Sequence, residues 1–245
     1  MRLQVILEGG NFPRHYHFAL SSFVKNALSA SNPAIVETLY KFSDGKANKQ
    51  IKPFTGSVHM NNYELQGDEF IVHGDIRLNI SSPDVEFILN LYNGLIQQRV
   101  FQYKNYNFKV LHVKVLQEKL PKTGKVLCQT QSPIVVRNRE GKFLDIDDPD
   151  YLKELNYISN ECMKQLEGRF LYSPIKLTPV LMKKKVVQLK HEAFKGLNPQ
   201  GVLFLNAFVG SFILEGDPRD IQILVQAGIG FRRAEFLGNI EVIHE

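Results

Sequence analysis

Two short segments with the same design occur once in each half of the chain. The first, SPDVEFILNLYNG, begins at Ser82, and the second, DPRDIQILVQAG, begins at Asp217. In both, a residue that caps helices precedes a proline, and acidic side chains follow within the first turn. This combination stabilises a helix start, so the segments predict two matching helices. Their predicted buried stripes are Val85, Ile88, Leu89 and Tyr92 in the first helix and Ile221, Leu224 and Val225 in the second.

Strand-like runs surround both helices in the same order. In the first half we predict strands at residues 2–8, 54–60, 69–73, 75–80, 100–103 and 108–116, helices at 18–30 and 34–41, and a basic loop, SDGKANKQIK. In the second half we predict strands at 126–136, 185–191 and 202–214 and a helix at 150–166. A β-α-β-β-α-β unit, the ferredoxin-like motif, fits each half. The sequence therefore predicts an α+β fold of two tandem ferredoxin-like domains, residues 1–120 and 125–245, joined near the linker-like segment KLPKTGK.

The charge of the chain favours an anionic partner. Its 245 residues carry a formal net charge of +5. Nucleic acid is the commonest partner of such a surface. A basic protein that binds no nucleic acid has the same charge, so charge alone leaves both alternatives open.

Cysteine usage and hydropathy indicate the compartment. Cys128 and Cys162 lie in no C-x-x-C pair and in no spacing typical of zinc ligands, so we expect buried free thiols in a reducing cytoplasm. The first residues, MRLQVILEGG, predict a strand rather than a signal peptide. No apolar stretch reaches the length of a membrane span. We therefore predict a cytoplasmic protein with no membrane partner.

A glycine-rich loop with two arginines, GIGFRRAEFLG, covers residues 228–238. Gly228 follows a predicted helix, so one interpretation is a left-handed helix cap and a tight turn. The other is RNA binding, in which Gly228, Gly230 and Gly238 bring the backbone close to phosphate and Arg232 and Arg233 bind it in forked geometry. Gly238, Arg232 and Arg233 together favour the RNA interpretation. The loop follows a helix, which excludes the dinucleotide-binding fingerprint.

Basic residues also gather on a predicted hairpin and before the first helix. The hairpin carries Lys183, Lys184, Lys185 and Lys190, which either protect an edge strand or contact phosphate. With the basic loop nearby, phosphate contact is favoured. His15 and His17 lie in a turn and are the histidines expected to be freest to reach a ligand, with His15 assigned to RNA. No carboxylate accompanies this pair, so no metal site is predicted.

Four stretches in this order resemble one family. They are FPRHYHFALSSFVKNALSASNPAIVETLY, with its Asn32-Pro33 break, IKPFTGS, CQTQSPIVV and the glycine-rich loop. The chain resembles the CRISPR-associated endoribonucleases that cut precursor CRISPR RNA within each repeat, members of the repeat-associated mysterious protein superfamily. The resemblance spans nearly the whole chain. It implies two ferredoxin-like domains with an RNA-binding cleft between them, and a glycine-rich loop that touches the RNA.

The resemblance also implies three catalytic positions. Lys52 matches the family's lysine, Tyr40 stands where histidine is usual, and Lys25 stands where tyrosine is usual. The implied reaction is attack by a ribose 2′-hydroxyl on the adjacent phosphate, which leaves a 2′,3′-cyclic phosphate. Histidine suits proton transfer near neutral pH, whereas tyrosine donates a proton but hardly accepts one. Two lysines supply positive charge for the transition state. The alternatives are an exposed helix residue for Lys25 and a packing residue for Tyr40.

The sequence thus predicts a metal-independent endoribonuclease without a cofactor. The alternative is a protein that binds CRISPR repeat RNA but has lost cleavage together with the histidine. A general RRM-like binder is disfavoured, because no signature of stacking aromatics is present. The predicted partners are CRISPR repeat RNA and a larger CRISPR effector complex, and the chain is expected to be a monomer or a homodimer.

Overall fold

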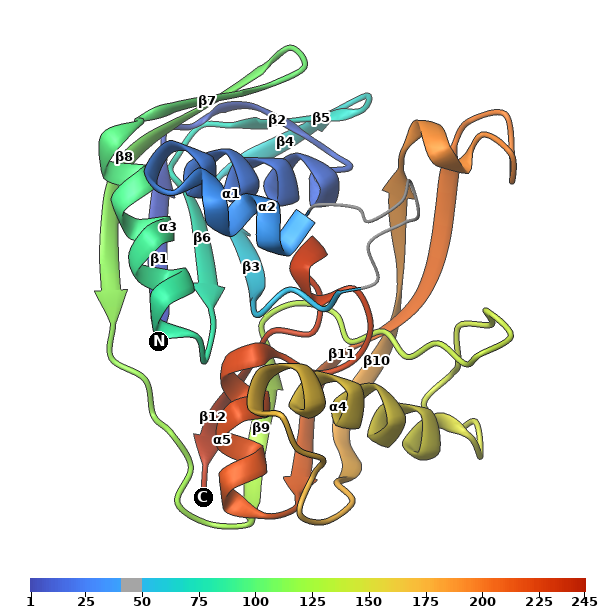
Figure 1. The fold of residues 1–245 in the computed structure, drawn as a ribbon. Helices are drawn as coiled ribbons and strands as arrows, with labels where there is room; N and C mark the ends of the chain where they lie inside the picture. Colours follow the sequence, from blue (N-terminus) through green and yellow to red (C-terminus); the bar gives the residue numbers. More distant parts are fainter. Residues whose placement is uncertain (41–49) are drawn as a thin grey trace.

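The computed structural model describes residues 1–40 and 50–245 and contains two stacked ferredoxin-like units (Figure 1). Most of the predicted basic loop SDGKANKQIK, and the last residue of the predicted helix 34–41, lie outside the described residues. The first unit is a sheet in the order β3-β6-β1-β8, extended at one edge by β7. Its strands are β1 (Arg2–Leu7), β3 (Thr55–Met60), β6 (Ile76–Ser81), β7 (Val100–Tyr103) and β8 (Tyr106–Leu116). Helices α1 (His17–Ser31), α2 (Pro33–Tyr40) and α3 (Val85–Gln97) accompany it.

The second unit repeats this topology. Its sheet runs β10-β11-β9-β12, which is again second, third, first and fourth strand of a ferredoxin-like unit. Its elements are β9 (Lys125–Thr130), α4 (Tyr151–Glu167), β10 (Lys176–Lys190), β11 (Val202–Glu215), α5 (Pro218–Ala227) and β12 (Ile240–His244). The predicted fold class is therefore confirmed. The predicted linker falls between β8 and β9, while the exact domain limits stay a prediction.

The two capped helices that predicted the repeat differ in detail. In α5 the Asp217 side chain accepts a hydrogen bond from the backbone of Arg219, with proline at the first turn, as expected. In α3 the cap is Asp84 rather than Ser82, and its Oδ1 accepts from the backbone N–H of Phe87. The helix therefore begins after Pro83, two residues later than predicted.

The buried face of α3 also differs from the predicted stripe. Val85 and Leu89 are 52% and 51% exposed, so the prediction was wrong for these two. The buried residues are Phe87, Ile88, Leu91, Gly94 and Leu95. The segment VEFILNLY is apolar on more than one face, so periodicity alone did not select the face that packs on α1.

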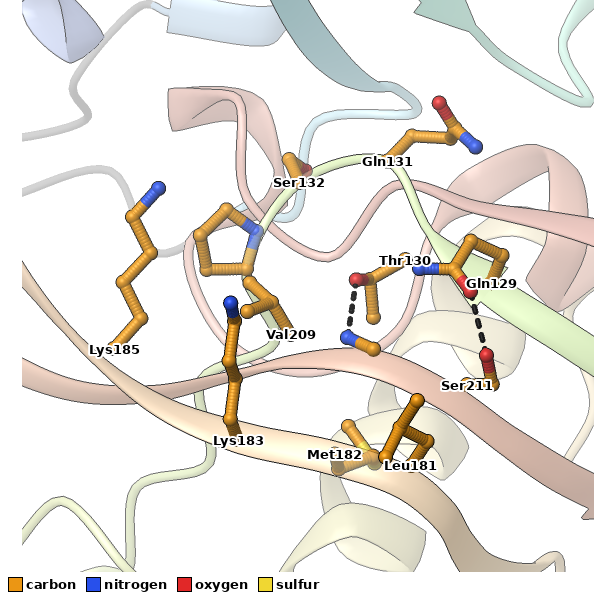
Figure 2. A pocket seen from close by; sticks show the side chains of 12 residues that line it. Gln129, Thr130, Gln131, Ser132, Leu181, Met182, Lys183, Lys185, Val209 and Ser211 are labelled. Atoms are coloured by element: carbon orange, nitrogen blue, oxygen red, sulfur yellow. Dashed lines mark hydrogen bonds between the residues drawn. The ribbon is translucent and has the colours of Figure 1, made fainter.

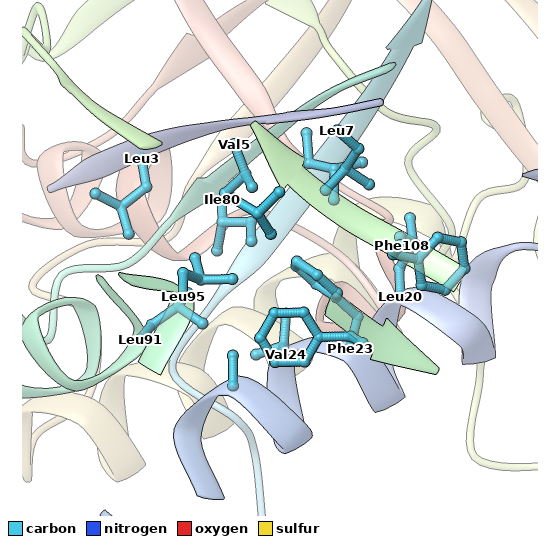
Figure 3. Packing of buried hydrophobic residues seen from close by; sticks show 14 of the residues in the cluster. Leu3, Val5, Leu7, Leu20, Phe23, Val24, Ile80, Leu91, Leu95 and Phe108 are labelled. Carbon is cyan, nitrogen blue, oxygen red and sulfur yellow. The ribbon is translucent and has the colours of Figure 1, made fainter. Parts of the chain in front are cut away.

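The core of the first unit lies between its sheet and its helices (Figure 3). Leu3, Val5 and Leu7 of β1 point toward Phe23 and Val24 of α1. The same cluster includes Phe236, which belongs to the glycine-rich loop of the second unit. The loop therefore contributes to the core of the other ferredoxin-like unit, and it holds the two units together.

The longest strands form a ribbon that extends beyond the second sheet (Figure 1). Over this ribbon β10 pairs with β11 along its length, whereas β9 reaches only the last part of β11, from Ser211. The short 3₁₀ helix η2 (Glu192–Phe194) follows β10. The strand predicted at 185–191 thus begins earlier, at Lys176, and the one predicted at 126–136 ends at Thr130.

A small third sheet, β2-β5-β4, completes the first unit. Its strands are β2 (Gly10–Pro13), β4 (Tyr63–Gln66) and β5 (Glu69–Val72). Among the helices that the structure describes, none is long and apolar enough to cross a membrane.

Candidate functional site

A pocket of about 730 Å³ lies at the junction of the two units. We call it the junction pocket. Helices α1 and α2 and the segment 50–52 line it from the first unit, and α4, Arg137 and residues 230–235 line it from the second. Its lining includes Phe18, Ser21, Tyr40, Gln50, Ile51, Lys52, Arg137, Tyr157, Ile158, Glu161, Arg232 and Glu235.

The three predicted catalytic residues come together around the Tyr40 ring: Tyr40 and Lys52 line this pocket, and Lys25 lies beside Tyr40 on the exposed side of α1. The Nζ atoms of Lys25 and Lys52 lie 5.4 and 5.1 Å from the centre of the Tyr40 ring. Both distances fall within the range of a cation–π interaction, which is attractive because the ring face is electron-rich. One tyrosine at the end of α2 therefore holds an ammonium from α1 and an ammonium from the segment before β3.

Burial changes the acid–base properties of this cluster. The Tyr40 hydroxyl is buried and has no hydrogen-bond partner among the described residues. Burial disfavours the phenolate and raises the pKa of Tyr40 well above its usual range. Burial also disfavours the ammonium of Lys52 and lowers the pKa of that side chain. Its Nζ donates a hydrogen bond to the carbonyl of Gln50 at 3.0 Å. Lys52 is thus a better proton donor and acceptor near neutral pH than a free lysine.

The glycine-rich loop is held by side chains of the first unit. Thr55 Oγ1 donates to the carbonyl of Leu237 at 2.8 Å, and Ser21 Oγ donates to that of Ala234 at 2.8 Å. His17 Nδ1 donates to the carbonyl of Glu235 at 2.7 Å. These donors satisfy carbonyls that would otherwise be buried without partners, which is costly. The loop is therefore an interdomain clasp as well as a wall of the junction pocket.

The glycines of the loop serve this packing. Gly228, Gly230 and Gly238 all have positive φ, at 79°, 83° and 69°, which favours glycine. A Cβ on Gly238 would lie 1.9 Å from the carbonyl oxygen of Ile229, and one on Gly228 would lie 2.7 Å from Thr55. Both residues are buried against protein. The prediction that Gly228 and Gly238 contact the RNA backbone was therefore wrong. Gly228 has ψ of 167°, so it is not the predicted left-handed cap. Gly230 lines the pocket, and its contact with RNA stays a prediction.

The two arginines of the loop have different environments. Arg233 is only 6% exposed, and its Nη1 donates to the carbonyl of Ala227 at 3.0 Å and to Cys162 Sγ at 2.9 Å. Arg233 therefore joins the loop to α5 and α4. The prediction that Arg233 contacts RNA was wrong. Arg232 lines the junction pocket and pairs with Glu235. It remains a candidate for phosphate.

The histidines before α1 are less free than predicted. His17 is 5% exposed, and burial, with Lys185 and His15 nearby, lowers its pKa to about 4. The expectation that it reaches a ligand was therefore wrong. His15 Nδ1 donates to the carbonyl of Gln188 on β10 at 3.3 Å, and its Nε2 lies 4.0 Å from Asp68. Its contact with RNA stays a prediction.

A second pocket, of about 600 Å³, lies beside β10 and carries two of the predicted lysines (Figure 2). Lys183 and Lys185 rise from β10 on the same side, toward the segment of Ser132. Neither has an ion pair within residues 1–40 and 50–245. Lys184 and Lys190 instead pair with Asp145 at 2.8 Å and Asp68 at 2.7 Å. The rest of the lining includes Gln129, Thr130, Gln131, Pro133, Leu181, Met182, Val209, Gly210 and Ser211.

Comparison with known proteins identifies the family. The model of the family described as CRISPR associated protein Cas6, C-terminal, matches residues 116–242. The chain belongs to the Cas6 family. The curated protein "CRISPR-associated endoribonuclease Cas6 1" of Methanocaldococcus jannaschii is 29% identical over 165 residues, which cover 65% of this chain. The match spans 59% of that relative's length. The family resemblance predicted from the sequence is confirmed.

Solved structures share the fold of this Cas6-family chain. One, from a characterisation of a Cas6-related gene of Pyrococcus furiosus, has a TM-score of 0.81 at 20% identity and covers 100% of this chain and 99% of that one. Another, described as a RAMP protein binding different RNA substrates, has a TM-score of 0.80 at 18% identity and covers 100% of both chains. At these identities the likeness establishes the tandem ferredoxin-like architecture.

Several residues of the junction pocket in this Cas6-family chain were not predicted. Arg137, Tyr157 and Glu161 come from the segment after β9 and from α4, and Phe18 comes from α1. Glu235 lies inside the glycine-rich loop, but the sequence prediction assigns no role to its carboxylate. The negative charge of Glu235 was the one sequence signal for its role. A carboxylate in a loop that is predicted to bind phosphate needs a cationic partner nearby.

Proposed function

We propose that this chain binds CRISPR repeat RNA and cleaves precursor CRISPR RNA at the junction pocket without a metal. The observation that carries the proposal is the meeting of Lys25 and Lys52 at the ring of Tyr40, beside the junction pocket of a Cas6-family fold. The three residues come from separate segments of the first unit. Their convergence favours a shared role, since two ammonium groups that share one ring suit a doubly charged phosphorane.

The proposed reaction divides into charge stabilisation and proton transfer. The 2′-oxygen forms a bond to phosphorus, the bond from phosphorus to the 5′-oxygen breaks, and a 2′,3′-cyclic phosphate and a 5′-hydroxyl result. The 2′-hydroxyl loses a proton, and the departing 5′-oxygen gains one. Lys25 and Lys52 stabilise the phosphorane. Lys52 is the residue best suited to move a proton, because burial lowers its pKa toward neutrality.

Tyr40 acts in this scheme through its ring rather than its hydroxyl. The hydroxyl is buried, lacks a partner among the described residues and has a raised pKa, so it is a poor proton donor. The ring holds the two ammonium groups by cation–π attraction. The hypothesis that Tyr40 donates a proton is therefore replaced by a positioning role.

The pocket beside β10 offers a path for the RNA strand. Lys183 and Lys185 supply positive charge for phosphates, and amide and hydroxyl groups of Gln129, Thr130 and Gln131 are able to bond base edges. Proteins bind single-stranded nucleic acid with such basic grooves. We include Lys183 and Lys185 in the proposed RNA-binding surface for this reason.

The second candidate is a protein that binds repeat RNA without cleaving it. The observation that favours it is the composition of the junction pocket, where no histidine is present among the lining residues that the structure describes. Burial lowers the pKa of Lys52 there, and a single lysine serves two proton transfers poorly. The Glu235 carboxylate, whose pKa burial raises, is already paired with Arg232. Under this second candidate function, the chain binds repeat RNA but has no catalytic activity.

The two candidates are separated by a cleavage assay in EDTA. The chain is incubated with repeat RNA transcribed from the CRISPR array of its own host. For the enzyme we expect one discrete cut per repeat, with a 2′,3′-cyclic phosphate on the upstream product, unaffected by the chelator. Tight binding with intact RNA at every pH supports the second candidate. A cut that EDTA abolishes contradicts the proposed chemistry.

Substitutions of Tyr40 test its positioning role. Tyr40→Phe keeps the ring and should leave the single-turnover rate within about threefold, because loss of a true general acid costs roughly 10²–10⁴-fold. It should also raise the free energy of unfolding by about 1 kcal/mol, because a buried hydroxyl without a partner is removed. Tyr40→Leu should slow cleavage by roughly tenfold or more as both cation–π contacts are lost. Tyr40→His should raise the rate, since an imidazole titrates near neutral pH.

The phenylalanine variant is decisive. A loss of a hundredfold or more in Tyr40→Phe, with folding and affinity intact, contradicts the positioning role and restores the hydroxyl as a proton donor. An unaltered rate in Tyr40→His means that position 40 does not face the scissile phosphate.

A further inference from the structure

An ion pair inside the junction pocket joins Arg232 to Glu235. Arg232 Nη1 lies 2.5 Å from Glu235 Oε1, and the two side chains are 21% and 18% exposed. Both residues line the junction pocket, as do the catalytic candidates Tyr40 and Lys52. Arg232, the candidate of the glycine-rich loop for binding phosphate, is therefore already bound to the Glu235 carboxylate of the same loop.

The pair is incomplete. Arg232 Nε and Glu235 Oε2 are buried and have no hydrogen-bond partner among the described residues. A buried polar atom without a partner is costly, and more so on a charged group. Arg232 also has φ of 60° and ψ of 37°, a left-handed conformation that strains a residue with a side chain. The ion pair of Arg232 with Glu235 therefore costs the protein free energy. An anion that bonded more of the guanidinium N–H groups would bind Arg232 more favourably.

Aromatic rings fix the guanidinium at this position. Its central carbon lies 5.3 Å from the centre of the Phe231 ring and 5.8 Å from that of Phe194. The Glu235 carbonyl is held separately by His17. The backbone of the loop is thus anchored, and the carboxylate of Glu235 is able to turn away without moving the chain.

We propose that Glu235 masks Arg232 in the RNA-free protein and that an RNA phosphate displaces its carboxylate. This inference rests on the proposed RNA binding at the junction pocket. A guanidinium binds carboxylate and phosphodiester oxygens with the same forked N–H groups, so one anion replaces the other. A small free anion that displaces the Glu235 carboxylate gains only its own contact with Arg232. RNA brings further phosphates to the other cations, which offsets the cost of freeing Glu235, so the mask favours polyanions over single ions.

Acid should remove the mask. Burial raises the pKa of Glu235, against the opposing effect of Arg232 and His191, so the carboxylate is neutralised at a higher pH than an exposed glutamate. As pH falls, protonation releases Arg232 and RNA affinity rises. The other titratable or charged groups that line the pocket or contact this part of the loop are His17, Tyr40, Lys52, Arg137, Tyr157, Glu161 and Arg233. Acid also changes the charge of other groups of the chain, so the Glu235 contribution is the difference in affinity gain between variants.

The test measures affinity for the host's own repeat RNA, with a 2′-deoxy nucleotide at any mapped cut, by fluorescence anisotropy. The variants are E235Q, R232A and the double variant. E161Q is the matched control, because it removes the same charge from the same pocket without an ion pair to Arg232 among the described residues. We expect E235Q to bind about tenfold more tightly than the native chain near pH 8, a change of about 1.4 kcal/mol. E161Q should gain clearly less, and the gain of E235Q should vanish in R232A.

Two results would overturn the inference. One is an E235Q gain no larger than that of E161Q, and the other is a gain that persists without Arg232. If E235Q does not fold, the native chain and R232A are compared as the pH is lowered from about pH 8 to about pH 4.5, close to the ordinary pKa of a glutamate, and the native chain should gain more affinity. Equal gains overturn the mask. Loss of binding by every variant and by the native chain overturns the proposed function itself.

Discussion

Replacing Lys52 by alanine should slow cleavage of repeat RNA by roughly 10²–10⁴-fold, because a positioned proton-transfer group is removed together with a charge on the phosphorane. Affinity should change little, since one phosphate contact among several is lost. The measurement is single-turnover cleavage at saturating RNA, paired with an equilibrium binding curve. Lys52 is favoured over Lys25 for this effect because its pKa is lowered by burial, whereas Lys25 stands on the exposed side of α1.

Two control substitutions show whether the effect of Lys52→Ala is specific to catalysis. Lys153→Ala removes an exposed lysine of α4, whose Nζ lies 3.4 Å from Asp150, and should leave rate and affinity unchanged. Lys183→Ala with Lys185→Ala should weaken binding and flatten its dependence on salt, with the logarithmic slope falling by about two. A Lys52→Ala rate within tenfold of the native rate contradicts the catalytic role. Equal losses of affinity and rate would make Lys52 only a binding residue.

The fold was predictable because it depends on local signals. The capped starts at Ser82-Pro83 and Asp217-Pro218, with strands on either side, predicted the repeated unit, and both sheets have its strand order. The exact start of α3 and its buried face were not predictable. The choice between Leu89 and Phe87 depends on which surface α1 presents, which is a tertiary contact.

The site was predictable in part. The positions of Lys25, Tyr40 and Lys52 came from the family pattern, and their side chains do meet, but which group titrates near neutrality depends on burial. The environment of each charge in the glycine-rich loop could not be read from sequence. Arg233 meets Cys162, which is 71 positions earlier in the chain, whereas its neighbour Arg232 faces the pocket.

Gly238→Ala should lower the free energy of unfolding by roughly 3–5 kcal/mol, the largest stability change we expect in the loop. The φ of 69° strains any residue with a side chain, and the new Cβ would lie 1.9 Å from the carbonyl oxygen of Ile229. The backbone has little freedom to move. The N–H of Gly238 donates to Pro133 at 2.8 Å, and its carbonyl accepts from Ile229 at 2.9 Å.

Gly168→Ala separates the two contributions. Gly168 ends α4 with nearly the same φ, 68°, but a Cβ there meets nothing within 4 Å. It should therefore cost only about 1 kcal/mol, the strain of the left-handed backbone alone. Urea unfolding of both variants measures the difference. If Gly238→Ala is as stable as Gly168→Ala and instead loses RNA affinity, the glycine serves the RNA and not the packing. If it unfolds far more easily, the close approach of two backbone segments at the interdomain clasp is what requires glycine.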